Sequence, residues 1–373
     1  GKLSQLQEEI ALLGSRPLLV SGSRSFIESD SYKELQSIFA KLNLSVATAH
    51  IGSEPSPEQI DDIVTTHQES KRDVVIAIGG GSVLDAGKAL SAMLVEKGSV
   101  IRFLEGRGTE QPTGRKLPFI AIPTTSGTGS EATSNAVISS VGADGFKKSL
   151  RHTNYIPELA LVDPNLTLSC PRELTVACSM DCFTQLVEGY LSTNGSRITD
   201  ALALDGIRVV HRSLQLVCTN GRSIGARTDL AYGALLSGIV LANAGLGTVH
   251  GFASAIGGYF TVPHGVVCGT LMATANKLTL KSLRSQGDKT NSLQKYTTLG
   301  RICSGAEKKS DTWFQNFFTD ELERLTDELA IPKLGAFGVK TDDIDKIVAQ
   351  TGNKYNPVRL AENELAELLQ SRM

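Results

Sequence analysis

The stretch DVVIAIGGGSVLDAGKALSAMLV, residues 73–95, joins a β-branched apolar run to a helical pattern through three glycines and a serine. A buried strand that turns directly into a helix is typical of a β-α-β unit in a parallel sheet. Backbone amides at the start of such a helix suit the pyrophosphate of a dinucleotide. The predicted coenzyme contacts in this turn are Gly79, Gly80, Gly81 and Ser82. A tight turn that needs a positive φ is the alternative explanation of the glycines.

The same alternation extends through the first half of the chain. Further strands are predicted at residues 17–23, 45–51, 117–125 and 159–164, with helices at 31–43 and 57–70. After Pro171, apolar residues recur at helical spacing in residues 174–192, 198–217 and 229–244. We therefore expect an α/β protein in which a Rossmann-like parallel-sheet domain, residues 1–166, precedes an all-helical domain, residues 167–373.

Composition limits the classes of function. The 373 residues, 41% of them hydrophobic, are enough for two domains with cores of their own. Lys and Arg number 37 against 39 Asp and Glu, for a formal charge of -2, so we expect no nucleic-acid partner and a small-molecule substrate instead.

Cysteine spacing and hydropathy indicate a cytoplasmic protein. The six cysteines are irregularly spaced without a C-x-x-C pair, which argues against a disulfide framework or a structural zinc knuckle and indicates reduced thiols. We expect no membrane segment, because no apolar run reaches the length of a span and no signal segment is evident. The chain begins at Gly1 without Met, and we expect a trimmed segment ahead of it.

A second small-residue loop follows the apolar run at residues 117–125. Its candidate coenzyme contacts are Thr124, Thr125 and Thr128. Two such loops favour a dinucleotide. After the first predicted strand come Gly22, Ser23 and Arg24, where an NAD-binding fold would place an acid for the ribose 2′-hydroxyl. Because Ser23 and Arg24 suit a 2′-phosphate instead, NADP(H) is favoured over NAD(H); an Arg24 that is merely solvated is the alternative.

Two of the six histidines, His250 and His264, lie 14 residues apart in GLGTVHGFASAIGGYFTVPHG. Asp181 and Gln185 are four apart, so one helix face presents both side chains to a single ion. Two imidazoles with a carboxylate suit Fe(II) and are acceptable to Zn(II). Histidines satisfied by backbone carbonyls in a core are the simpler alternative.

Several motifs together resemble the group III, iron-containing alcohol dehydrogenases, within the superfamily that includes dehydroquinate synthase and glycerol dehydrogenase. They are GGGSVLDAGKA, IPTTSGTGSEAT, LALVDPNLT, MDCFTQLVEGY, TDALALDGI and GLGTVHGFASAIGGYFTVPHG. The resemblance covers nearly the whole chain. It implies that Asp85 and Lys147 lie near the coenzyme, that a metal lies in the cleft between the domains, and that Asp181, His250 and His264 bind it. A homodimer or larger assembly is also expected.

Three positions depart from the family pattern. Gln185 replaces the fourth ligand, usually histidine, with a neutral and weaker donor. Ser254 stands where many members have a histidine near the nicotinamide, so it could pass a proton through water but is no base itself. Glu54 stands where an Asn-Pro usually touches the adenosine side.

The expected activity is hydride transfer between NAD(P)(H) and a small alcohol or aldehyde, with the metal stabilising the alkoxide. Three alternatives keep the fold. They are a metal-independent keto acid reductase of the maleylacetate reductase type, a lyase like dehydroquinate synthase, and a binding protein without catalysis. Gln185 is the residue that supports the first of them.

Overall fold

The computed structural model describes residues 1–22 and 26–373. The chain forms two compact units. The first contains Gly1–Ser140 and Lys147–Cys170, and the second contains Val141–Phe146 and Pro171–Met373.

A five-stranded parallel sheet, in the order β2-β1-β3-β4-β7, is the centre of the first unit. The strands are β1 (Pro17–Ser21), β2 (Ala47–His50), β3 (Val74–Gly79), β4 (Phe119–Pro123) and β7 (Leu159–Ala160). Ala77 of β3 pairs with Val20 of β1 and with Ala121 of β4, which fixes the register of the three central strands. The predicted parallel sheet is confirmed.

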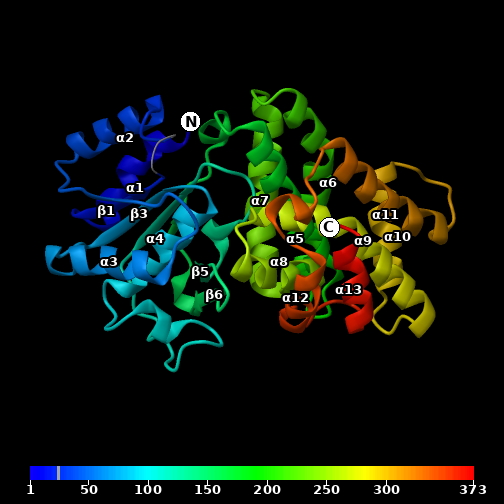
Figure 1. Cartoon of the computed structure of the whole chain (residues 1–373). Coiled ribbons are helices and arrows are strands. Elements are labelled where there is room, and N and C mark those ends of the chain that lie inside the picture. Colours follow the sequence, from blue (N-terminus) through cyan, green and yellow to red (C-terminus); the bar gives the residue numbers. More distant parts are fainter. Residues whose placement is uncertain (23–25) are drawn as a thin grey trace. The chain divides into compact units, whose positions relative to one another are not determined.

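Side chains alternate between the two faces of this sheet. Leu19, Ile76 and Ile120 pack in one core cluster with residues of α1 and α2. On the other side, a Cβ at Gly87 of α4 would lie 2.5 Å from the Cβ of Ala77, so this helix lies directly against the strands. Figure 1 shows the strands between these helices. The helices of this unit are α1 (Leu6–Leu13), α2 (Asp30–Lys41), α3 (Pro57–His67) and α4 (Gly81–Met93).

A two-stranded sheet of β5 (Asn135–Ser140) and β6 (Phe146–Arg151) was not predicted. The sequence of β6, FKKSLR, has no β-branched residue and two adjacent lysines. Such a strand has neither the composition nor the apolar alternation by which strands are predicted from sequence.

The second unit is built from helices, as predicted. They are α5 (Arg172–Leu191), α6 (Arg197–Thr219), α7 (Ile224–Ala244), α8 (Thr248–Tyr259), α9 (His264–Gln286), α10 (Ser292–Ser304), α11 (Asp311–Glu328), α12 (Ile344–Gln350) and α13 (Glu362–Gln370). Helix α5 is buried along almost its whole length, and α6, α7 and α9 pack around it. It therefore presents polar side chains to the interior as well as apolar ones.

Helix α7 is long and apolar enough to cross a membrane by length and composition. However, 56% of its most apolar window is buried inside the unit, where it packs against α5 and α6. Burial of this kind is typical of a core helix.

An ion-pair network ties α6 to α11. Glu321 of α11 lies 2.8 Å from Nε2 of His211 on α6 and accepts hydrogen bonds of 2.7 and 2.6 Å from the guanidinium of Arg324. Burial opposes ionisation of Glu321, but the hydrogen bonds from Arg324 and His211 outweigh it and lower the pKa of the carboxyl to about 2.

We expect Glu321→Gln to lower the free energy of unfolding by roughly 1–3 kcal/mol near neutral pH, because Arg324 and His211 lose their anionic hydrogen-bond acceptor. A lowered carboxyl pKa stabilises the fold above the ordinary value of 4.5, and this contribution is lost as the pH falls toward about 2. The difference between wild type and variant in urea denaturation should therefore narrow as the pH falls. Glu307→Gln, at an exposed position, is the control; a pH-independent difference would contradict the assignment.

Candidate functional site

The structure brings together three residues predicted as metal ligands, all within the second unit. Asp181, on α5, is 2% exposed. Its Oδ1 atom lies 3.3 Å from Nε2 of His250, in the first turn of α8, and 3.6 Å from Nε2 of His264, the first residue of α9. The starts of two helices thus direct two imidazoles at one buried carboxylate.

The orientation of His250 is set by a second carboxylate. Glu188 Oε2 lies 2.7 Å from His250 Nδ1, and its Oε1 accepts a 2.6 Å hydrogen bond from the backbone N–H of Val249. This arrangement places the ring proton on Nδ1 and leaves Nε2 available as a ligand. Sequence reasoning missed Glu188, although it lies two helical turns after Asp181 on the same face of α5.

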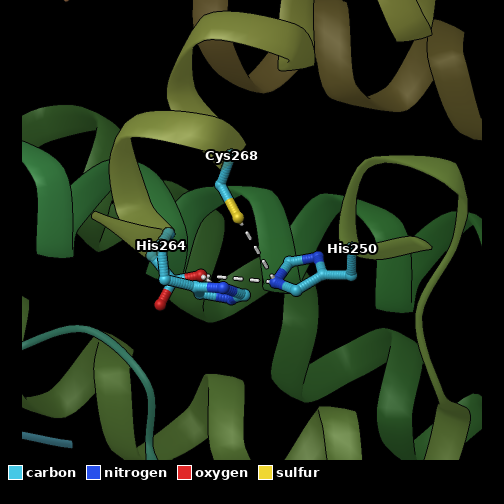
Figure 2. A group of neighbouring side chains, drawn as sticks. His250, His264 and Cys268 are labelled. Carbon is cyan, nitrogen blue, oxygen red and sulfur yellow. Dashed lines mark hydrogen bonds and ion pairs between the residues drawn. The ribbon is translucent and has the colours of Figure 1, made fainter. Parts of the chain in front are cut away.

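A cysteine joins this cluster. Cys268 Sγ lies 3.7 Å from His250 Nε2, the nitrogen that also faces Asp181 Oδ1, and Figure 2 shows the dashed line from Cys268 to His250. The ligand atoms of Asp181, His250, His264 and Cys268 all lie within 4.8 Å of one another. From its spacing among the cysteines, Cys268 was predicted only to be a reduced thiol. The signal for its role is the four-residue spacing from His264, which puts both side chains on one face of α9.

Gln185 lies one turn after Asp181 on α5 and is 3% exposed. Among the described residues, its Oε1 atom is buried without a hydrogen-bond partner. A buried hydrogen-bond acceptor without a partner lowers the stability of the fold. A ligand that donates a hydrogen bond to Gln185 Oε1, or a cation that this oxygen binds, would explain why the atom is kept there. Two imidazoles, a carboxylate, a thiol and this amide oxygen form a donor set that fits a divalent cation.

Ser254 lies one turn after His250 on α8 and is exposed in the second unit. Its hydroxyl is therefore open to water, as the predicted relay role requires. The structure shows no direct bond from Ser254 to the described histidines.

Protonation is coupled within the cluster. Burial opposes the charge of Asp181, but the imidazoles of His264 and His250 hold its pKa below the usual range. Burial disfavours a charged His250, yet Cys268 and Asp181 beside it raise its pKa well above the ordinary value. Burial raises the pKa of the Cys268 thiol to about 12. A divalent ion would compete with these protons for the same atoms.

Each histidine is followed by a glycine that allows a close approach. A Cβ at Gly265 would lie 2.0 Å from the carbonyl oxygen of Ala177 on α5, and one at Gly251 would lie 1.8 Å from the carbonyl oxygen of Gly352. Neither distance is tolerable for a side chain. His264 can therefore reach Asp181 only because α9 begins in direct contact with the backbone of α5.

The predicted dinucleotide loop lies in the first unit, where β3 ends at Gly79 and α4 begins at Gly81. Within residues 1–22 and 26–373, no side chain caps α4, and its first turn has no acidic residue, so its N–H groups suit an anion. Positive φ is not the reason for the glycines, since none of the three has one. A Cβ at Gly81 would lie 2.6 Å from Cγ2 of Thr128, so close contact with the second loop explains at least this glycine.

Lys88, which sequence reasoning missed, holds the segment from Ser130, the last residue of the second loop (residues 124–130), to Asn135. Lys88 is fully buried in α4, and its Nζ donates to Ser130 O, Ser130 Oγ, Thr133 Oγ1 and Asn135 O at 2.8–3.1 Å. Ser130 Oγ in turn donates to Asp85 Oδ1 at 2.6 Å. Thr124 and Thr125 are half-buried at the end of β4. The two loops therefore share one hydrogen-bonded scaffold.

Other residues predicted to contact the coenzyme have these surroundings. Lys147 of β6 forms an ion pair with Glu54, whose Oε2 accepts a 2.7 Å hydrogen bond from Ser139 Oγ. Glu54, whose effect the sequence left open, is thus the counter-ion of Lys147. Gly22 is half-buried with open space where a Cβ would be, whereas Ser23 and Arg24 lie outside the described residues.

Two family models match the chain. "Iron-containing alcohol dehydrogenase" matches residues 1–164, and "Fe-containing alcohol dehydrogenase family, C-terminal" matches residues 175–373. Long-chain-alcohol dehydrogenase 1 of Geobacillus thermodenitrificans is 32% identical over 93% of this chain and 86% of its own length. The 1,3-propanediol dehydrogenase of Citrobacter freundii is 28% identical over 96% of this chain and 94% of its own.

Solved structures show the same architecture. A 1,3-propanediol oxidoreductase superposes with a TM-score of 0.89 at 26% identity, covering 100% of this chain and 96% of the other. An alcohol dehydrogenase from Oenococcus oeni gives 0.88 at 26% identity, with the same coverage.

We expect Gly265→Ala to destabilise the protein by about 1–3 kcal/mol and to weaken divalent-metal binding, because the added methyl group forces the start of α9 away from α5. Urea denaturation and a zinc titration against a competing chelator measure the two effects. Gly225→Ala is the matched control, since a Cβ there meets nothing within 4 Å and α7 should gain up to about 1 kcal/mol. An unchanged metal affinity in Gly265→Ala would contradict the view that the contact between α9 and α5 at Gly265 positions His264 for the metal.

Proposed function

The chain belongs to the iron-containing alcohol dehydrogenase family, and from this premise we propose that it transfers hydride between a nicotinamide coenzyme and a small alcohol or aldehyde. The family implies a divalent metal and NAD(H) use. We propose that Asp181, His250 and His264 hold the metal, Fe(II) or Zn(II). The observation that carries this proposal is the pair of Nε2 atoms at 3.3 and 3.6 Å from one carboxylate oxygen that is almost inaccessible to water.

When bound, the ion would supply Lewis acidity to the oxygen of the alcohol or aldehyde. The surrounding side chains have separate tasks. Asp181 supplies the negative charge, and Glu188 keeps the Nδ1 proton of His250 in place. Ser254, which is exposed, passes the hydroxyl proton to solvent water and does not act as a base alone.

For the coenzyme, we propose that the pyrophosphate lies at the uncapped start of α4, against Gly79, Gly80, Gly81 and Ser82. Further contacts come from Asp85, Lys147 and the threonines of the second loop, Thr124, Thr125 and Thr128. Gly22, Ser23 and Arg24 take the ribose and favour NADP(H). The support for this preference is the absence of an acid after β1.

Gln185 supports one alternative, a metal-independent reductase of activated keto acids. The amide is a weaker ligand than imidazole, and a polar pocket can bind a carboxylate substrate through it. Metal content separates the metal-dependent dehydrogenase from the metal-independent keto acid reductase. Net oxidation of the coenzyme separates both from a lyase of the dehydroquinate synthase type, which uses the dinucleotide only transiently.

We expect the purified protein to contain stoichiometric iron or zinc and to oxidise NADPH with small aldehydes in a chelator-sensitive reaction. His264→Ala should remove the metal and lower turnover on the order of a thousandfold, while NADPH affinity stays unchanged. His67→Ala, on α3 of the other unit, is the control. A metal-free protein that reduces keto acids would favour the alternative, and loss of coenzyme binding in His264→Ala would contradict the proposed site.

Coenzyme preference gives a further prediction. The kcat/KM ratio of NADPH to NADH should exceed one and should fall roughly tenfold to a hundredfold in Arg24→Ala, because a charge-assisted bond to the 2′-phosphate is worth about 1.5–3 kcal/mol. Lys41→Ala, at the exposed end of α2, should leave the ratio unchanged. If wild type and Arg24→Ala have the same ratio of kcat/KM for NADPH to that for NADH, Arg24 does not contact the 2′-phosphate and is a solvated side chain.

A further inference from the structure

The cluster contains two potential ligands that the proposed function does not assign to the metal, Cys268 and Gln185. We propose that Cys268 is the fourth protein ligand of the divalent ion, beside Asp181, His250 and His264, and that this set makes the chain a zinc enzyme. The inference rests on the proposed metal-dependent function and adds the ligand set and the metal.

Three separations between ligand atoms agree with a tetrahedral site, and all four atoms lie within 4.8 Å of one another. With zinc bonds of about 2.0–2.2 Å to nitrogen and oxygen and 2.3 Å to sulfur, neighbouring ligand atoms lie roughly 3.3 Å apart for nitrogen and oxygen, and roughly 3.6 Å for nitrogen and sulfur. The observed separations are 3.3 Å from His250 Nε2 to Asp181 Oδ1 and 3.7 Å from His250 Nε2 to Cys268 Sγ. His264 Nε2 lies 3.6 Å from the same carboxylate oxygen.

The ligand atoms also direct their lone pairs at a common point. Glu188 engages His250 through Nδ1, so Nε2 is directed at Asp181 and Cys268. Figure 2 shows the Cys268 sulfur and the His264 ring on the same side of His250. Because His264 and Cys268 lie one turn apart on α9, a single rigid element positions both.

Charge favours the thiol over the amide of Gln185 as the fourth donor. A metal-bound cysteine is deprotonated, so Asp181 and Cys268 together neutralise a divalent cation. With Gln185 as the fourth donor, the ion and its direct ligands would keep one net positive charge, which Glu188 offsets from behind His250 and not by binding the ion. Gln185 Oε1 then remains an acceptor beside the ion rather than the ligand that compensates for a missing histidine.

The softness of the donor atoms indicates which metal this site prefers. A thiolate with two imidazoles and a carboxylate is a set that zinc accepts readily, whereas Fe(II) oxidoreductase sites are typically built from two imidazoles and a carboxylate alone. Zinc should therefore bind more tightly to this chain than iron does.

The test is to remove the metal from the full-length protein and reload it anaerobically with Co(II), which reports a thiolate ligand by a near-ultraviolet charge-transfer band. Wild type should show the band, and Cys268→Ser should lose it while binding zinc at least roughly tenfold to a hundredfold more weakly. Cys182→Ser, a buried cysteine next to Asp181, is the matched control and should keep the band. Circular dichroism verifies that each variant is folded.

The outcomes separate the two proposals. Co(II) that binds to wild type without the band, or a band that persists in Cys268→Ser, overturns the role of Cys268 and leaves the metal-dependent function standing. A protein that binds no Co(II) or zinc at all overturns both. Gln185→Ala serves as a second variant, and it should retain the band because the amide is not the fourth ligand.

Discussion

The site in the second unit depends on a carboxylate that is almost completely removed from water. An isolated buried carboxylate is too costly to stay ionised, so partners that offset its charge must surround Asp181. The first turns of α8 and α9 provide them as His250 and His264. That demand accounts for the glycine after each histidine, since a methyl group at either position would collide with a neighbouring carbonyl. It also accounts for Glu188, which holds one imidazole in place.

Much of the fold could be predicted because local patterns and tertiary packing agree. Residues 74–79, which form β3, are buried on both faces, and their apolar run is typical of a strand in a parallel sheet. Helices α5, α6 and α7 follow from their apolar periodicity. Strand β6 could not be predicted, because the charge of Lys147 is paired with a residue far away in the sequence. Its partner is Glu54, 93 residues earlier. Such pairing leaves no trace in a local window.

The candidate metal site was predicted in part. Asp181 and the two histidines stand in motifs that resemble the family, whereas Cys268 is one of six scattered cysteines. Its relevance appears only once His264 is known to begin a helix. Lys88 was missed for another reason. Its acceptors include a carbonyl and hydroxyls 42–47 residues further along the chain, and a lysine within a helical pattern ordinarily indicates a solvated face.

The buried ammonium of Lys88 has a consequence for coenzyme exchange. Because its hydrogen bonds tie residues 130–135 to α4, the end of the small-residue loop is already ordered. A dinucleotide that binds there, as we propose, would therefore cost this segment less conformational entropy. A loop that is ordered beforehand can bind and release a coenzyme without a slow step of ordering or disordering. Association and dissociation of the coenzyme should then be governed by its contacts with a preformed surface, and a rapid exchange of oxidised for reduced coenzyme does not require the loop to unfold.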